Sequence, residues 1–186
     1  GTSAAFLLKL VSRIRPTQKV FFIDTGYHFK TTLEYKNELT KAYQLNVKDL
    51  QPDEYLHQYS KENELWKTDP DTCCHVNKVT PLSSIIAKHK IWISGLIAYQ
   101  TPHRGTLNIF EQEEDIIKFY PFIDITESEF LGHVLYHKLP QHPLKKLGYD
   151  SVGCTHCTSK GKGRSGRWST QAKTECGLHQ NYFKKT

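Results

Sequence analysis

Five cysteines are the residues best suited to chemistry in this sequence. They form an adjacent pair, Cys73 and Cys74, a C-x-x-C pair, Cys154 and Cys157, and a single Cys176. A C-x-x-C motif places two thiolates on one turn, where they can bind one metal centre that takes two further ligands from elsewhere. The adjacent pair can supply those ligands. Five is an odd number, which suits four ligands and one reactive thiol better than disulfides.

The adjacent pair also indicates the kind of metal centre. Two neighbouring side chains turn awkwardly toward one small tetrahedral ion, whereas an iron–sulfur cubane offers a separate iron to each sulfur. The pattern therefore favours an iron–sulfur cluster over zinc. Two alternatives stay open here. Some of these thiols are ordinary buried residues, or the four hold zinc and stabilise a basic binding module.

Cys176 stands apart from the other four, in the polar sequence Glu175-Cys176-Gly177-Leu178-His179. A thiolate is the competent form of a cysteine nucleophile, and nearby cations stabilise it. The candidates to stabilise this thiolate and to neutralise an anionic substrate are Lys78, Arg164, Arg167 and His179. From spacing alone, a single cysteine in such a position is more often inert than catalytic.

Length and charge limit the class of protein. The chain has 186 residues and a formal net charge of +6. The length suits one domain with an extension, and the charge favours anionic ligands such as nucleotides, sulfate esters or nucleic acids. No stretch is apolar for long enough to cross a bilayer, and the first residues lack the pattern of a signal peptide. We therefore expect a cytoplasmic protein that does not bind membranes.

Alternating helices and strands must position these side chains. The spacing of apolar residues predicts helices over 3–14, 31–43 and 79–88, and a last helix, behind a capping box that begins at Thr126, as far as 138. Short apolar runs predict strands over 19–23, 45–50, 91–94, 106–110 and 116–120. This alternation predicts an α/β fold with a doubly wound, mostly parallel sheet.

The turn Asp24-Thr25-Gly26 follows the first of these strands. Doubly wound sheets bind their ligands at the carboxyl ends of strands, so the turn is a candidate binding site, with a plain strand-to-loop turn as the alternative. The composition changes at residue 151, beyond which glycine, lysine, arginine and cysteine dominate as far as Arg167. Such a segment is ordered only if something anchors it. We expect an α/β domain over 1–150 and an irregular, cysteine-containing segment over 151–186.

Six motifs, in order along essentially the whole chain, resemble those of the adenosine phosphosulfate and phosphoadenosine phosphosulfate reductases. They are Phe21-Phe22-Ile23-Asp24-Thr25-Gly26-Tyr27-His28-Phe29, Trp92-Ile93-Ser94-Gly95-Leu96, His142-Pro143-Leu144, Gly148-Tyr149-Asp150-Ser151-Val152-Gly153-Cys154, Gly166-Arg167-Trp168 and residues 175–179. The resemblance implies an adenine nucleotide alpha hydrolase-like, Rossmann-type fold. It also implies nucleotide binding by 1–150, and cluster binding and catalysis by 151–186.

The resemblance assigns roles to single residues. It implies that Cys73, Cys74, Cys154 and Cys157 hold a 4Fe-4S cluster, which marks the branch that prefers adenosine 5′-phosphosulfate. Cys176 matches the family's nucleophile, and Lys78 matches the lysine between cluster and substrate. The residues that resemble other substrate-side groups are Arg104, Arg164, Arg167, Asp24, Thr25, Gly26 and, as a hydrogen-bond partner in the closing tail, His179.

Two departures from the family pattern stand out. Gly1 aligns with the last glycine of the family's phosphate loop, so we expect the first strand and most of that loop to precede this sequence. The run Leu96-Ile97-Ala98-Tyr99-Gln100 lies where the family usually has two consecutive arginines before an acidic residue and glutamine. The absence of two positive charges there predicts a lower affinity for an anionic substrate.

The implied activity is thioredoxin-dependent reduction of adenosine 5′-phosphosulfate to sulfite and AMP, through an S-sulfocysteine intermediate on Cys176, in assimilatory sulfate reduction. The implied partners are the substrate, a reductant of thioredoxin or glutaredoxin type and, in an oligomer, further copies of the chain, without nucleic acid or membrane. The alternatives are a phosphoadenosine phosphosulfate reductase and a tRNA-thiolating enzyme of the same superfamily. The ending Glu175-Cys176-Gly177-Leu178-His179 speaks against tRNA thiolation, because that ending is typical of the reductases.

Overall fold

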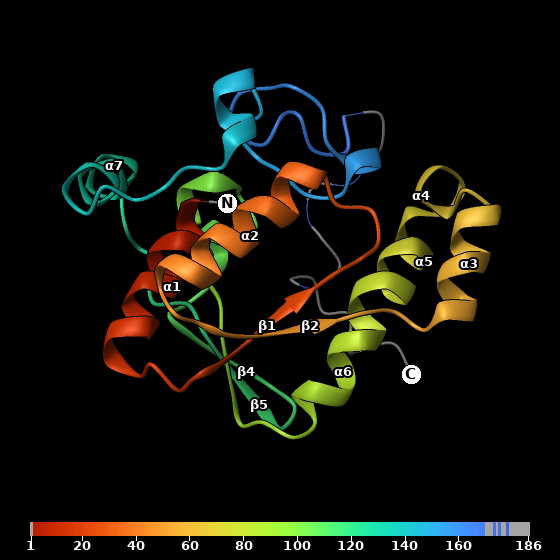
Figure 1. Ribbon diagram of the computed structural model, residues 1–186, viewed down its shortest axis with the longest axis horizontal. Coiled ribbons are helices and arrows are strands. Elements are labelled where there is room, and N and C mark those ends of the chain that lie inside the picture. The colour runs from red at the N-terminus through yellow and green to blue at the C-terminus, as the bar shows by residue number, and fades with distance from the viewer. Residues whose placement is uncertain (1, 170–172, 174, 176–177, 179–186) are drawn as a thin grey trace.

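The computed structural model describes residues 2–169, 173, 175 and 178, which form an α/β fold with helices around short strands (Figure 1). The helices are α1 Thr2–Ile14, α2 Lys30–Ala42, α3 Glu54–Glu62, α4 Leu65–Thr68, α5 Pro70–Cys74, α6 Thr80–Ile86 and α7 Glu127–Tyr136. The strands are β1 Lys19–Ile23, β2 Asn46–Leu50, β3 Ile91–Ile93, β4 Phe110–Glu113 and β5 Ile116–Phe119. The predicted fold class is confirmed, and most predicted elements lie within two residues of the observed ones.

The described strands form two hydrogen-bonded groups. In the first, β1 pairs in parallel with β2, with Lys19 opposite Asn46 and Ile23 opposite Leu50. In the second, β5 lies between β3, which is parallel to it, and β4, which is antiparallel. Helices α1 and α2 lie together over one side of the β1–β2 pair, whereas α3 to α6 gather beyond the end of β2 (Figure 1). The strand β1 is only half-buried, although a short apolar run is typical of a fully buried strand.

One strand was predicted in the wrong place. The sequence predicted a strand over 106–110, but β4 spans Phe110–Glu113 and includes two glutamates, Glu111 and Glu113. Glu113 is buried in this strand because it forms an ion pair with the buried Lys118 of β5. An apolar pattern does not reveal a strand whose buried side chain is charged. The chain reverses at Glu114, which has a φ of 49°.

The sequence reading also missed the helices between residues 54 and 74. Asp53 caps α3 by accepting a hydrogen bond from Leu56 N at 3.0 Å, and Asp69 caps α5 in the same way from Thr72 N at 3.0 Å. The two aspartates are recognisable in the sequence as helix caps. The apolar periodicity of α3 is weak, because Ser60 is its one buried residue, so the helix was not predicted. A π-helical turn, His75–Val79, joins α5 to α6 in one helical run.

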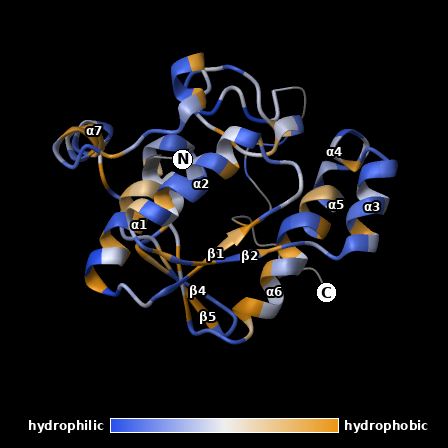
Figure 2. Ribbon diagram, in the orientation of Figure 1, coloured by the Kyte–Doolittle hydropathy of each residue, from blue (hydrophilic) through white to orange (hydrophobic). Residues whose placement is uncertain are grey.

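The largest apolar cluster packs α1 against α7 and the loops beside β5. The rings of Phe6 and Phe122 stack with their centroids 4.7 Å apart. Ile97 is fully buried in the same cluster, which also contains Phe130, Val134 and Leu139. Figure 2 shows a further apolar stretch along β1, outside this cluster. No helix in the described part of the chain is both long enough and apolar enough to span a membrane.

The stretch from residue 151 to residue 169 is anchored to the loop that follows β1. His28, just after β1, forms an isolated bridge with Cys154, and Thr155 N donates to Tyr27 O at 2.8 Å. The segment also folds on itself, since Thr158 forms a bridge with Arg167. It includes a 3-10 turn, Thr155–Cys157, and it runs across the end of α2 in Figure 1. These contacts place residues 154–157, which we call the cysteine loop, close to the carboxyl end of β1.

Candidate active site

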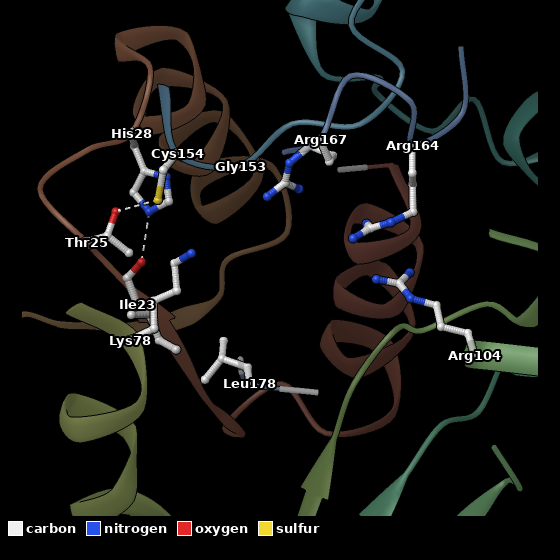
Figure 3. A pocket seen from close by; sticks show the side chains of 10 residues that line it. All are labelled: Ile23, Thr25, His28, Lys78, Arg104, Gly153, Cys154, Arg164, Arg167 and Leu178. Atoms are coloured by element: carbon white, nitrogen blue, oxygen red, sulfur yellow. Dashed lines mark hydrogen bonds between the residues drawn. The ribbon is translucent and has the colours of Figure 1, made fainter. Parts of the chain in front are cut away.

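A cavity of about 210 Å³ lies at the carboxyl end of β1. It is built from five separate parts of the chain: the end of β1, the π-helical turn, a 3-10 turn that begins at Arg104, the segment after residue 150, and Leu178. The described lining residues are Ile23, Thr25, His28, Lys78, Arg104, Gly153, Cys154, Arg164, Arg167 and Leu178. Figure 3 shows their side chains around the cavity.

Four cations face this cavity, and no acidic side chain is among its described lining residues. The charged ends of Lys78, Arg104, Arg164 and Arg167 turn toward one another around the same space (Figure 3). Guanidinium groups fork to paired oxygens, which suits phosphate and sulfo groups. The predicted cations are therefore brought together from distant parts of the sequence, in an arrangement that fits an anionic ligand.

Two of these arginines share one carboxylate, that of Glu175. Arg104 Nε donates to Glu175 Oε1 at 2.9 Å, and Arg164 Nη2 donates to Glu175 Oε2 at 3.1 Å. Burial raises the pKa of Glu175, but the hydrogen bond and charge of Arg104, the Thr101 hydroxyl and Arg164 outweigh it and hold the pKa below its ordinary value. Glu175 is therefore ionised at neutral pH. The sequence placed Glu175 in a motif but did not predict a role for its carboxylate.

Arg167 depends on its neighbours for its position. Its Nε donates to Cys157 O at 3.0 Å, and its guanidinium lies 4.3 Å from the ring centroid of Trp168. A Cβ at position 153 would overlap the Arg167 guanidinium, so a side chain there would displace the arginine from its present position. The absence of a side chain at Gly153, just before Cys154, thus leaves space that the Arg167 guanidinium occupies.

Three of the four paired cysteines meet beside the cavity. Cys73, Cys154 and Cys157 share a buried cluster with Trp168, and Cys74, which follows Cys73 in the sequence, is also buried. They come from α5, from the bridge at residue 154 and from the 3-10 turn. Burial raises the pKa of Cys73 and of Cys157, so both are protonated thiols at neutral pH unless a metal binds.

Two polar contacts connect the cysteines to the cavity. Lys78 lies one helical turn after Cys74, and its Nζ is 3.6 Å from Cys74 Sγ. Thr25 Oγ1 is 3.3 Å from Cys154 Sγ. Both Lys78 and Thr25 also line the cavity, so each of these side chains contacts a thiol and borders the cavity.

The residues around the thiols fit a sulfur-rich cluster. Trp168 Nε1 is a buried donor without a hydrogen-bond partner among the described residues, in the same cluster as three of the thiols. An acceptor such as a thiolate or a cluster sulfide would satisfy it. In the part of the chain that the structure describes, no group of three or more His, Cys, Asp or Glu side chains is placed to hold a metal ion.

Other predicted site residues fall in different places. Thr25 lines the cavity and is buried, whereas Asp24 and Gly26 are not among the lining residues. Asp24 instead accepts a hydrogen bond from Gly26 N at 3.1 Å. Gly26 has a φ of 70°, and a Cβ at this position would overlap the His57 ring. Cys176 and His179 lie outside the described residues.

The sequence reading missed a buried polar group beside Cys73. Asn77 Nδ2 donates to Cys73 O at 2.8 Å and to Ser60 Oγ at 3.1 Å, while Asn77 Oδ1 is 2.7 Å from His57 Nδ1. His57 is half-buried. One signal could have indicated the group: Asn77 is one helical turn after Cys73, so their side chains share a helix face.

Comparisons with known proteins identify the family. The family model for the phosphoadenosine phosphosulfate reductase domain matches residues 1–160. The adenosine 5′-phosphosulfate reductases of Bacillus cereus (strain AH187) and Bacillus mycoides (strain KBAB4) are each 37% identical over 188 residues, which cover 96% of this chain and 80% of the relative.

Solved structures show the same fold. The phosphoadenylyl-sulfate reductase of Candida auris has a TM-score of 0.72 at 24% identity, over 86% of this chain and 79% of that one. Yeast FAD synthetase has a TM-score of 0.57 at 14% identity, over 87% of this chain and 56% of that one. Because the family model spans most of the sequence and relatives at 37% identity cover nearly all of it, the chain belongs to the phosphoadenosine phosphosulfate reductase family of oxidoreductases, as its motifs predicted.

Proposed function

We propose that this protein reduces adenosine 5′-phosphosulfate to sulfite and AMP, with Cys176 as the nucleophile. The observation that carries the proposal is the position of the residues on both sides of Cys176 in the sequence. Glu175 is paired with two arginines of the cationic cavity, and Leu178 lines that cavity. The curated relatives of 37% identity carry the name of this activity, which supports the same substrate for this chain.

The reaction needs cations because of the charge on the substrate. The sulfur atom of a sulfo group bound to phosphate is electrophilic, but the oxygens around it are negative and repel a thiolate. In the proposed mechanism four cations contact these oxygens, since all of them line the cavity: Lys78, Arg104, Arg164 and Arg167. The Cys176 thiolate then gives its electron pair to the sulfur, and the bond between sulfur and the phosphate oxygen breaks, which releases AMP and leaves S-sulfocysteine.

A dithiol reductant of thioredoxin or glutaredoxin type completes the proposed cycle. One of its thiolates attacks Sγ of Cys176, and sulfite leaves with the electron pair of the broken bond. Its second thiol then breaks the mixed disulfide and restores the Cys176 thiolate. The two electrons that reduce the sulfur come from the reductant, which leaves as a disulfide.

In the same proposal, Cys73, Cys74, Cys154 and Cys157 hold a 4Fe-4S cluster as four thiolate ligands. When bound, the cluster supplies a fixed charge and a covalent tie between α5 and the cysteine loop. Lys78 contributes to this arrangement because it lines the cavity with its Nζ 3.6 Å from Cys74 Sγ. We assign nucleotide binding to residues 1–150, cluster binding and catalysis to 151–186, and a cytoplasmic location to the protein.

The test is sulfite release from adenosine 5′-phosphosulfate and from its 3′-phosphorylated form, with thioredoxin as the reductant. We expect turnover of the first substrate and none above background for Cys176→Ser. Activity in that variant equal to the parent would remove Cys176 from the mechanism. A preference for the 3′-phosphorylated substrate would support the phosphoadenosine phosphosulfate reductase alternative instead. Protein purified anaerobically should carry about four irons and four sulfides per chain, as a cubane requires, whereas bound zinc would contradict the cluster assignment.

A further inference from the structure

Ser60 places a buried hydroxyl on a helix that is otherwise mostly exposed. It is 0% exposed and is the one buried residue of α3. Its Oγ accepts hydrogen bonds from Asn77 Nδ2 at 3.1 Å and from the Tyr27 hydroxyl at 3.5 Å. Two donors occupy both lone pairs of a hydroxyl oxygen, so the hydrogen of the Ser60 hydroxyl is left to point at a third group.

The sulfur of Cys73 is that third group. Burial raises the pKa of the Cys73 thiol, and a hydrogen bond from Ser60 is the largest effect that lowers it. Asn77 Nδ2 also lies 3.7 Å from Cys73 Sγ. The sulfur of a neutral thiol is a weak acceptor, whereas a thiolate accepts charge-assisted hydrogen bonds. The two donors therefore suit a deprotonated Cys73, which is the form that binds a metal.

The direction of each hydrogen bond at Asn77 is fixed by its partners. Asn77 is 1% exposed, and its Nδ2 donates to Cys73 O at 2.8 Å. A carbonyl oxygen only accepts, so this contact identifies the amide nitrogen. Asn77 Oδ1 then lies 2.7 Å from His57 Nδ1, which makes the histidine nitrogen the donor. The His57 ring packs against Tyr27, with the ring centroids 4.9 Å apart. Donation thus runs from His57 and Tyr27 toward Cys73.

The two adjacent cysteines therefore meet different donors. Lys78 Nζ, a cation, lies 3.6 Å from Cys74 Sγ. The described donors to Cys73 Sγ, from Ser60 and Asn77, are neutral. Lys78 also lines the cationic cavity, whereas Ser60 and Asn77 are not among its described lining residues. The neutral donors thus act on the thiols and not on an anion in the cavity.

We propose that Ser60 and Asn77 are positioning residues for Cys73, whose sulfur they hold by hydrogen bonds, so that α3 stabilises the iron–sulfur cluster. The proposal rests on the proposed function, because that function includes the cluster. Hydrogen bonds to cluster sulfurs tune the electronic properties of the cluster, and groups that orient a ligand strengthen metal binding. Removal of the Ser60 hydroxyl takes one donor from the sulfur and leaves Asn77 and Tyr27 each without an acceptor.

The first readout is spectroscopic. Parent protein and Ser60→Ala are loaded with iron and sulfide in H2O and in D2O, and the iron–thiolate stretching bands are compared by resonance Raman spectroscopy. An exchangeable donor to sulfur makes these bands shift between the two solvents, so the shift should be smaller in Ser60→Ala than in the parent. Ser84→Ala is the matched control, because the Ser84 hydroxyl, on the neighbouring helix α6, donates to Pro81 O and not to sulfur. It should keep the parental shift.

The second readout is the rate at which the loaded protein loses its cluster to an iron chelator, followed by visible absorption without oxygen. Ser60→Ala should lose the cluster at least about fivefold faster than the parent, a ratio that corresponds to about 1 kcal/mol. Tyr27→Phe separates positioning from general stability. It removes a donor to Ser60 but keeps the Ser60 hydrogen for Cys73, so its solvent shift should equal that of the parent. If Ser60→Ala does not fold, Asn77→Leu takes its place, with the same expected results.

Two results would overturn the positioning role of Ser60 and Asn77. One is a parental solvent shift in folded Ser60→Ala or, in its place, Asn77→Leu, and the other is a parental rate of cluster loss in the same variant. A parent protein that takes up no cluster would overturn this role together with the cluster assignment. Failure of the proposed reaction is a separate result, because Cys176→Ser would then keep its sulfite release.

Discussion

Thr25 Oγ1 and Cys154 Sγ lie 3.3 Å apart although 129 positions separate them in the sequence. Thr25 lies in the turn after β1, and Cys154 is the first cysteine of the C-x-x-C pair at 154–157. Thr25 is 1% exposed, and its hydroxyl also accepts from Tyr27 N at 3.3 Å. This hydroxyl therefore ties the end of β1 to the residue that bridges to His28, and it connects the cationic cavity with the group of thiols.

Thr25→Val should loosen the cysteine loop. Valine keeps the shape of threonine but removes the hydroxyl, which leaves Tyr27 N without its acceptor and costs about 1 to 3 kcal/mol. We expect a lower free energy of unfolding in urea and faster alkylation of Cys154 in the metal-free protein. Thr25→Ser keeps the hydroxyl and should alkylate at the parental rate. Equal rates for the valine variant and the parent would show that the contact does not hold the loop.

Trp168→Phe should have a small effect on the metal-free protein and a larger effect on the iron-loaded protein. Trp168 Nε1 has no partner among the described residues, so its removal should change the free energy of unfolding of the metal-free protein by less than about 1 kcal/mol. In the iron-loaded protein the same change should speed the loss of visible absorption under air, because a donor to sulfur is missing. Equal lifetimes in the two proteins would contradict the idea that the indole N–H serves the cluster.

His142 should make the protein less stable in weak acid. Its Nδ1 accepts from Leu144 N at 3.3 Å, so its Nε2 carries the hydrogen and lies 3.0 Å from Thr32 Oγ1. Burial lowers the pKa of His142 to about 4. The unfolded chain takes up a proton near pH 6.5 but the folded one does not, so this contribution is complete above pH 6.5 and is lost as the pH falls toward 4.

The expected loss between pH 7 and pH 5 is about 2 kcal/mol in the free energy of unfolding. Urea unfolding at the two pH values measures it. His142→Gln should be less stable at pH 7 but should lose about 2 kcal/mol less on acidification. A variant with the same pH dependence as the parent would assign the effect to other groups.

Ile97→Arg should destabilise the fold, although the family usually has an arginine at this place in the motif. Ile97 is 0% exposed and packs with Phe6 and Phe122, so an arginine there would bury an unpaired charge at a cost of about 3 to 5 kcal/mol. Tyr99→Arg is the control, since Tyr99 is 43% exposed and such changes stay within about 0.5 kcal/mol. A soluble Ile97→Arg protein of parental stability would show that this part of the core rearranges.

The sequence by itself determined the fold class, most of the elements and the family. Amphipathic spacing in α1 and α2 and short apolar runs in β1 and β2 are local signals, so they are readable without a structure. The capping box at Thr126 is equally local, and Glu129 forms it as predicted. Motif order along the chain identified the family, because the spacing of chemically special residues survives where the residues between them differ.

Tertiary structure alone decided how these residues meet. The strand β4 was misplaced and α3 was missed because their buried positions carry Glu113 and Ser60, whose burial depends on partners elsewhere in the chain. The pairing of Arg104 with Glu175 spans 71 positions. No local pattern specifies which of several cations meets a given carboxylate, because Coulomb attraction and hydrogen bonds act through space, and the fold sets those distances only after the chain has packed.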